Sequence, residues 1–247
     1  MYKKILITTI LCFINTLTVF AYNEADLVLL KTTGNCPNGD LRGANLADHN
    51  FTNSNLSGAN LSFADLSNTI FKNANLQNSQ LLKANLSNSY AEQANLQGAN
   101  LTGANLRNAD LSRSNLSGAL AYRANFTHAT LDFANLRQLV AQEANFDYVT
   151  GTQTDFFAAN LASAWFYDAH LPSANFRSAN LYNTKLQLAN FTEASFINAN
   201  LTNSLLNKAN LTKTDLRNAT LENANLRNAI IMETNLENTN TLNTLKD

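Results

Sequence analysis

The sequence predicts an all-β solenoid whose chain winds in coils of four five-residue units, and three observations lead to this fold class. A large apolar residue recurs every five positions, with a small residue two places before it. This register runs from Leu41 to Leu236 without an insertion or deletion, which makes 40 consecutive units. Phenylalanines at the apolar position favour a spacing of four units. A period of five fits neither a helix nor a continuous strand, so each unit must combine a strand with a corner.

The alternation of side chains within a unit predicts its local geometry. In the stretch Ala99, Asn100, Leu101, the first and third side chains share one face and the middle one takes the other. The two residues that follow, Thr102 and Gly103, are of types that suit a turn. We therefore expect one very short strand and one turn per unit, with the apolar positions inside and rows of Asn that can hydrogen-bond along the outside.

The number of units per coil follows from the phenylalanines at the apolar position. Five pairs of them stand four units apart, among them Phe126 with Phe146 and Phe146 with Phe166. Solenoids favour the stacking of like side chains in neighbouring coils. Four units per coil are therefore predicted.

Residues 138–154 contain the weakest units. The apolar position carries Ala141 and Gly151, and the larger Leu139 and Val149 stand in the preceding small position as compensation. Whether this segment loops outward stays open at this stage.

The repeated motif is a small residue, then Asn or Asp, then Leu or Phe, then two polar residues, and it resembles that of the pentapeptide-repeat family. The match covers residues 40–236 and is unbroken. The resemblance implies the fold of that family, a right-handed quadrilateral β-helix, which 40 units would wind into about ten coils.

Residues 1–21 are predicted to be a secretory signal peptide, because Lys3 and Lys4 precede an apolar stretch and a small-residue cleavage site before Tyr22. A retained membrane anchor is the alternative, although the stretch is short for a spanning helix. Cleavage would leave 15 basic residues against 18 acidic ones, a charge of −3, because it removes two lysines and no acidic residue. The prediction is an exported protein, periplasmic or secreted, with no integral membrane span after cleavage.

Residues 22–39 are predicted to form an N-terminal cap, because an open solenoid end exposes core and unpaired strand edges. A short helix is expected from Asn23 to Lys31, with Asn23 as the N-cap and Gly34 past the end. Cys36 is the only cysteine left after cleavage, which excludes an intrachain disulfide. Its thiol is expected to be buried or idle, with an intermolecular bridge as the alternative.

Residues 237–247 are predicted to be a C-terminal tail or cap. Only Leu242 and Leu245 are available there to cover the last coil. An end-to-end homodimer through the last coils is therefore a hypothesis.

The chain shows no constellation of catalytic or metal-binding groups. His49, His128 and His170 do not converge in the solenoid, and the many serines have no partner base. The sequence predicts no enzyme, no cofactor and no metal site. Only 14% of the residues are charged and the formal net charge is −1, which leaves no basic surface for nucleic acid, so no nucleic-acid partner is predicted.

Outward aromatic residues break the polar surface in the segment of roughly 120–182. Tyr148, Trp165 and Tyr167 are expected on one face in adjacent coils, with two further tyrosines on one neighbouring face and Phe157 on the other neighbouring face. Exposed aromatics beside charges are typical contact residues, whereas packing over weak units is the alternative. The candidate partner-binding residues are Tyr122, Tyr148, Phe157, Trp165, Tyr167 and Tyr182.

Three functions are compatible with these observations. The first is an exported, non-enzymatic scaffold that binds a protein or glycan through its outer faces. The resemblance implies a second, because better-known members of the family resemble duplex DNA in shape and charge and bind DNA gyrase. The third is a passive structural protein of the cell envelope without a specific ligand.

Overall fold

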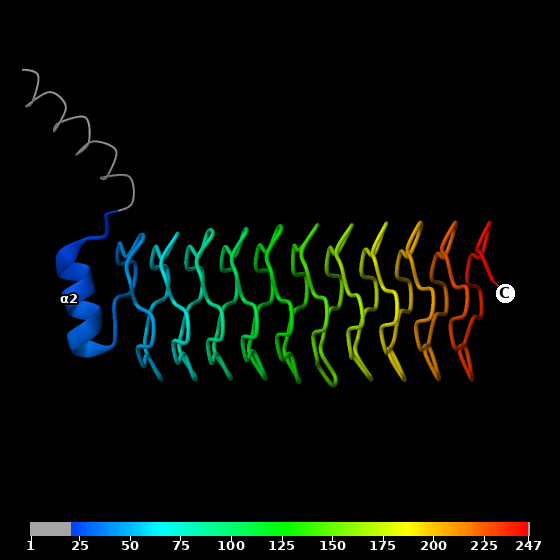
Figure 1. Ribbon diagram of the computed structural model, residues 1–247, viewed down its shortest axis with the longest axis horizontal. Coiled ribbons are helices and arrows are strands. Elements are labelled where there is room, and N and C mark those ends of the chain that lie inside the picture. The colour runs from blue at the N-terminus through cyan, green and yellow to red at the C-terminus, as the bar shows by residue number, and fades with distance from the viewer. Residues whose placement is uncertain (1–20, 247) are drawn as a thin grey trace, which may run out of the picture.

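The structure is a computed structural model that describes residues 21–246. Apart from Ala21, the predicted signal peptide lies outside the described residues. Figure 1 shows a straight rod of stacked coils with one helix at its N-terminal end. None of the helices in the described part of the chain is long and apolar enough to cross a membrane.

Neighbouring coils are joined by single-residue parallel bridges between positions four units apart. The bridges run from Asp40 with Asn60 to Asn225 with Leu245, which confirms four units per coil. At each bridge two backbone hydrogen bonds form: Leu106 N–H donates to Asn125 O (2.7 Å), and Asn125 N–H donates to Ala104 O (2.9 Å). The strands are even shorter than expected, because only the middle residue of each triplet bridges, and residues 21–246 contain no extended strand.

Most turns close with a hydrogen bond across three residues, and the second turn residue is left-handed. Ala109 N–H donates to Leu106 O (3.0 Å), and Asn108 has a φ of 58°. Asn is frequent at this second turn position because its short polar side chain tolerates the left-handed region better than most residues do. The turn residues therefore follow backbone geometry, and most of them are at least partly exposed at the corners of the rod.

The mid-strand Asn residues satisfy the backbone and also link the coils. Asn105 Oδ1 accepts the N–H of Arg107 (3.3 Å), and Asn105 Nδ2 donates to Asn85 Oδ1 one coil earlier (3.0 Å). Asn115, Asn95 and Asn135 form the same ladder in another row. The expected hydrogen-bonded rows of Asn are therefore confirmed.

The apolar positions fill the interior of the rod as predicted. Phe146 stacks on Phe126 at 4.6 Å and on Phe166 at 4.7 Å between ring centroids, and all three rings are fully buried. The phenylalanines that indicated four units per coil thus form a continuous stack. Close stacking of this kind fixes the rotamers of the rings and makes this part of the core stiff.

Residues 138–154 stay in the coil and do not loop outward. Bridges on both sides of the segment are intact, and Leu139 and Val149 are fully buried. A Cβ at Gly151 would lie 2.3 Å from Thr154 Oγ1 and 3.0 Å from Leu131 Cβ. The backbone at Gly151 thus approaches Thr154 and Leu131 closely, and any side chain at this position would require one of them to shift.

The N-terminal end is closed by helix α2, Glu24–Thr33. The Asn23 side chain accepts from Ala25 N–H, and Gly34 ends the helix with a φ of 73°, as expected. Asp26 Oδ2 accepts the N–H of Asp40 (2.8 Å), so the cap also pairs the backbone of the first coil.

Cys36 lies buried beneath this cap. It is a free cysteine, and burial, with a smaller contribution from the Asp26 charge, raises the pKa of its thiol. A raised pKa keeps the thiol protonated and weakly reactive, in keeping with the buried, idle thiol favoured by the sequence.

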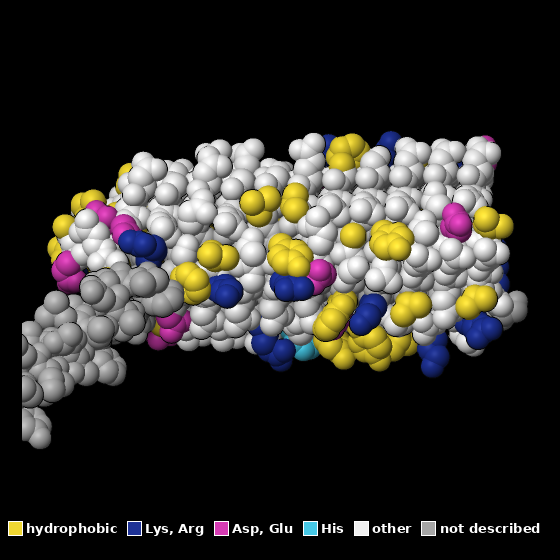
Figure 2. All heavy atoms as spheres, turned by 90° about the horizontal axis from the view of Figure 1, so that it is seen from above, with side chains coloured by type: hydrophobic (Ala, Val, Ile, Leu, Met, Phe, Trp, Pro, Cys, Tyr) yellow, Lys and Arg dark blue, Asp and Glu magenta, His cyan; other side chains and the backbone are white. Residues whose placement is uncertain are grey.

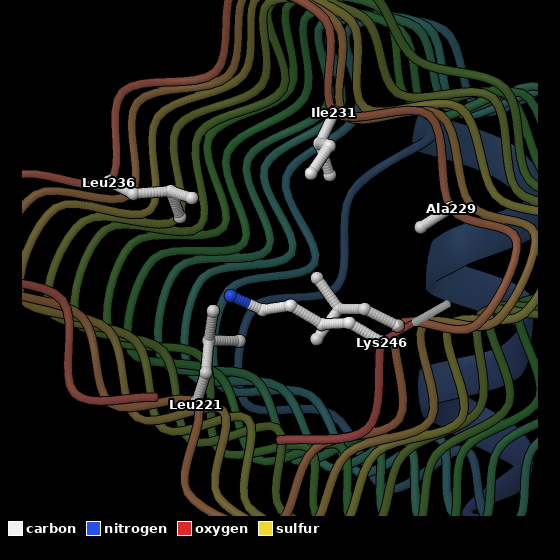
Figure 3. A pocket seen from close by; sticks show the side chains of 6 residues that line it. Leu221, Ala229, Ile231, Leu236 and Lys246 are labelled. Carbon is white, nitrogen blue, oxygen red and sulfur yellow. The ribbon is translucent and has the colours of Figure 1, made fainter. Parts of the chain in front are cut away.

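Within residues 21–246, no helix or further coil covers the C-terminal end of the rod. Regular winding continues to Leu245, past the predicted end of the repeat at Leu236, because backbone bridges persist where Thr241 takes the apolar position. Leu242 and Leu245 are exposed and leave a hollow of about 270 Å³ over the last coils. Figure 3 shows this hollow, with the side chain of Lys246 extending across it. The residues that line it are Leu221, Leu226, Ala229, Ile231, Leu236 and Lys246.

Candidate binding surface

Tyr148, Trp165 and Tyr167 lie together on the outside of the rod, as the register predicts, and we call them the aromatic surface. Trp165 is the middle residue of the bridge row Asn145, Trp165, Lys185, and the two tyrosines occupy the corner that follows this row in adjacent coils. The three residues are exposed by 40%, 43% and 39%. Figure 2 shows hydrophobic side chains gathered along one edge of the rod near its middle, next to basic side chains.

Neighbouring side chains cover part of the rings of the aromatic surface. Tyr148 lies between His128, stacked at 4.9 Å, and Tyr167, which meets it nearly edge-on at 5.7 Å. Lys185 Nζ sits 4.4 Å from the centroid of the Trp165 ring. These contacts connect four successive coils and hold the rings in defined positions. The contact of His128 was missed at the level of sequence, although this residue stands one full coil before Tyr148 and its position could have identified it.

Asp147 positions the aromatic surface through the backbone. In most units a mid-strand Asn or Asp accepts the N–H two residues on, but Trp165 offers no acceptor for Tyr167 N–H. Asp147 Oδ1, one coil earlier, accepts that N–H instead (2.7 Å). Burial raises the pKa of Asp147, and the bonds to Tyr167 and Asn145 oppose the rise. Asp132 accepts Thr152 N–H in the same way. Only the contacts between coils reveal this role of Asp147.

Tyr122 belongs to a charged cluster on the neighbouring corner. Its hydroxyl donates to Glu143 Oε1 (3.0 Å), and Arg123 Nε donates to Glu143 Oε2 (2.7 Å). The Arg123 guanidinium also lies 4.8 Å from the centroid of the Tyr122 ring. Hydrogen bonds from Arg123 and then Tyr122 lower the pKa of Glu143. Both oxygens of this carboxylate are therefore already bound.

Tyr182 lies on the same corner as Tyr122, three coils further along the rod, and is exposed. The two residues are thus on the neighbouring face, as predicted, but they do not touch each other. Tyr182 is an isolated aromatic residue that flanks the aromatic surface.

Phe157 requires a correction. It follows the row Asn135, Asp155, Asn175, which is half a coil from the row of Trp165 and therefore opposite to it. The prediction miscounted the faces. Each unit forms one of the four faces, and two units separate the row of Phe157 from the row of Trp165, so the two rows are on opposite faces. Arg137 stacks on Phe157 at 4.2 Å and pairs with Asp155 at 3.0 Å. Phe157 is thus held in a cluster of its own and is not part of the aromatic surface.

A shallow hollow of about 400 Å³ lies between the Tyr122 corner and the Trp165 row. Arg123, Glu143, Ser163 and Asn183 occupy the same corner position in four successive coils. The hollow forms because the long side chains of the first two residues are followed by the short side chains of the last two. Asn183 Nδ2 donates to Ser163 Oγ (3.2 Å) between neighbouring coils. The hollow was not predicted from the sequence, because it depends on the relative lengths of side chains one coil apart. We call it the Ser163 hollow; its lining residues are Arg123, Glu143, Ser163, Trp165, Asn183 and Lys185.

The histidines are dispersed in the structure. His49 is half-buried with Nδ1 2.8 Å from Ala47 O, His128 stacks on Tyr148, and His170 Nδ1 is 3.1 Å from Asn190 Nδ2. Residues 21–246 contain no group of three or more His, Cys, Asp or Glu side chains placed to hold a metal ion. The chemistry that these residues offer is contact and hydrogen bonding at a rigid surface.

Comparison with known families identifies the repeat. A family model described as a pentapeptide repeat region matches residues 44–120. A second, described as eight copies of pentapeptide repeats, matches six stretches between residues 104 and 240 that leave out only 151–153. A search of curated proteins returns no significant match.

Solved structures that match this chain include the following three. Full-length QnrB1, a plasmid-mediated fluoroquinolone resistance protein, aligns with 20% identity over 68% of this chain and 84% of its own, at a TM-score of 0.60. HetL is involved in heterocyst differentiation regulation in the cyanobacterium Nostoc sp. strain PCC 7120. It aligns with 22% identity over 92% of this chain and 98% of its own, at a TM-score of 0.37. A pentapeptide repeat protein of the Arabidopsis thaliana thylakoid lumen aligns with 28% identity over 46% of this chain and 68% of its own, at a TM-score of 0.29. The likeness to QnrB1 shows a shared fold alone.

Proposed function

This chain belongs to the pentapeptide-repeat family, and from that premise we propose that it is an exported, non-enzymatic scaffold that binds a protein partner through the aromatic surface. The finer features that the family resemblance implies, a right-handed quadrilateral helix of about ten coils, are part of the proposal. In this account the rod supplies rigidity and the outer side chains supply recognition.

The observation that carries the proposal is the position of three large aromatic side chains where this repeat usually has Asn, Ser or Thr. They are exposed by about 40% each, adjacent in space, and directly outside the Phe126, Phe146, Phe166 stack. Trp and Tyr are enriched among the residues that dominate binding energy. Because the rings are already held by neighbours, binding would cost little side-chain entropy.

A protein partner is favoured over a glycan by the orientation of the rings. A sugar packs its C–H groups on an open ring face, but His128 and Tyr167 flank Tyr148, and Lys185 lies over Trp165. These neighbours leave less open ring face for a sugar, whereas ring edges, polar tips and the lysine stem are available to a partner, and protein interfaces use such groups. A glycan partner stays the alternative within the scaffold proposal.

The other two functions have weaker support. A protein that imitates DNA and binds gyrase should carry a strongly acidic surface, yet the full chain has 17 basic and 18 acidic residues. A passive structural protein needs no aromatic surface, and for that function substitutions there should be silent. The charge balance and the aromatic surface both favour the binding scaffold.

Replacing Trp165 and Tyr167 by Ser should weaken partner binding without unfolding the rod, because both side chains are outside the core. Proteins captured from extracellular and envelope fractions by immobilised wild-type protein are compared with those captured by the double variant. We expect at least about tenfold weaker capture of the specific partner, the loss typical of hot-spot residues. The matched control replaces Tyr90 and Phe133, which are exposed on other rows, by Ser. Identical capture by both variants, with circular dichroism unchanged, would remove the aromatic surface from the proposal.

Export is proposed from the basic and apolar pattern of residues 1–21. Fractionated producing cells should contain the mature protein outside the cytoplasm, with Tyr22 as its first residue in N-terminal sequencing. An intracellular protein that keeps residues 1–21 would overturn export, and a gyrase supercoiling assay would then be the appropriate functional test.

We also propose that a second copy of this chain covers the open C-terminal end. Helix α2 closes the other end and pairs its backbone, so a second C-terminal end supplies the matching open edge. Two such ends form a closed, self-complementary dimer and not a filament. A monomer mass that does not change with concentration would contradict this contact.

A further inference from the structure

We propose that the Ser163 hollow receives the carboxylate of an acidic side chain from the protein partner. This inference rests on the proposed function and specifies the chemistry of the same surface. The hollow is bordered by Trp165. A partner segment with an acidic residue next to an apolar residue could therefore place the carboxylate in the hollow and the apolar side chain on the aromatic surface.

The charges that line the hollow favour an anion. Arg123 and Lys185 contribute two positive charges against the one negative charge of Glu143. Both oxygens of Glu143 are bound, one by Arg123 Nε and the other by the Tyr122 hydroxyl. The hollow therefore contains a neutralised ion pair on one side and the Lys185 cation on the other.

Lys185 is the cation that remains available. Among residues 21–246 no carboxylate oxygen lies within 4.0 Å of its Nζ, so it takes part in none of the ion pairs of the described chain. The Lys185 charge acts on Asp147, whose pKa is raised by burial, and it opposes that rise together with the hydrogen bonds of this carboxylate. Asp147 Oδ1 already accepts Tyr167 N–H, which commits that carboxylate to the backbone.

Ser163 adds a hydrogen-bond donor to the Lys185 cation in the hollow. Asn183 Nδ2 donates to Ser163 Oγ, which leaves the hydroxyl proton of Ser163 able to donate to a ligand. Hydrogen bonds from a lysine and a hydroxyl to a carboxylate are stronger than bonds between neutral groups. The Trp165 ring holds Lys185 Nζ at 4.4 Å, which reduces the entropy lost when the ammonium binds an anion.

Trp165 is the only tryptophan of the chain, so its fluorescence reports on the hollow directly. The full-length protein is titrated with three probes: a peptide of alternating Leu and Glu, the same peptide with Gln in place of Glu, and an oligogalacturonate of similar charge. We expect the Glu peptide to change the fluorescence with an affinity about tenfold higher than that of the Gln peptide. Lys185→Gln should remove this preference, and Lys185→Arg should keep it.

The matched control is Lys213→Gln, which removes the same charge from an exposed position on another corner. It should leave the preference for the Glu peptide unchanged. Equal binding of the two peptides would overturn the carboxylate site while leaving the scaffold proposal intact. Tighter binding of oligogalacturonate than of the Glu peptide would assign the hollow to an acidic glycan. A Glu peptide that leaves the fluorescence unchanged at its solubility limit would also overturn the inference, whatever the capture experiment shows.

Discussion

Leu106→Asp is expected to unfold the coils on either side of residue 106 and to lower the melting temperature by about 10 °C or more. Leu106 is fully buried, and its N–H bonds Asn125 O in the next coil. An unpaired charge in such an interior costs several kcal/mol. Each coil of a solenoid is stabilised only by its neighbours. The damage should therefore be centred on the substituted coil.

Thermal melting by circular dichroism measures the loss of stability, and amide hydrogen exchange shows which coils have opened. Arg107→Asp is the matched control, because Arg107 is the next residue and is exposed at the corner. It introduces the same carboxylate and should change the melting temperature by only a few degrees. Equal melting temperatures for Leu106→Asp and the wild type would mean that the apolar column is not the source of stability.

Ile231→Lys is expected to convert a dimer of the wild-type protein into a monomer and so to halve its mass in solution. Ile231 lines the open C-terminal hollow, and its side chain is 46% exposed in the single chain. In a tail-to-tail dimer the twofold axis would bring two lysines together in an apolar contact. Like charges and desolvation would both oppose association.

Sedimentation velocity over a wide range of protein concentrations tests this expectation. Ile70→Lys is the control, since Ile70 is also partly exposed but lies far from the C-terminal end. The control should remain dimeric. A wild-type mass that is already monomeric at every concentration would exclude the dimer, and an unchanged dimer in Ile231→Lys would place the contact elsewhere on the rod.

Much of the aromatic surface could be predicted by counting. Because the chain returns to the same face after every four units, the positions of Tyr148, Trp165 and Tyr167 alone place them in adjacent coils. The same counting, done correctly, would have placed Phe157 on the opposite row. A one-dimensional register is thus sufficient to decide which side chains share a face of this rod.

The contacts within that surface could not be predicted in the same way. Asp147 caps Tyr167 N–H because Trp165 lacks an acceptor, which requires knowing which atoms point at each other between coils. The Ser163 hollow depends on short side chains lying beside long ones in a column. Side-chain rotamers and the distances between coils decide such features, and the repeat pattern does not specify them.

The sequence by itself determined the architecture of this protein. The repeated pattern of a small residue, Asn and Leu, with a period of five residues, is compatible with one backbone arrangement. In it, each unit pairs with the unit that comes four units later in the chain. The sequence also indicated a capped N-terminal end and a poorly covered C-terminal end, whereas only the tertiary structure decided the shape of the C-terminal hollow and which outer side chains are held by their neighbours. The reason is physical: core packing and backbone pairing recur in every unit and are visible as a pattern. Surface contacts and end effects occur once, and they depend on three-dimensional distances between side chains that no repeat specifies.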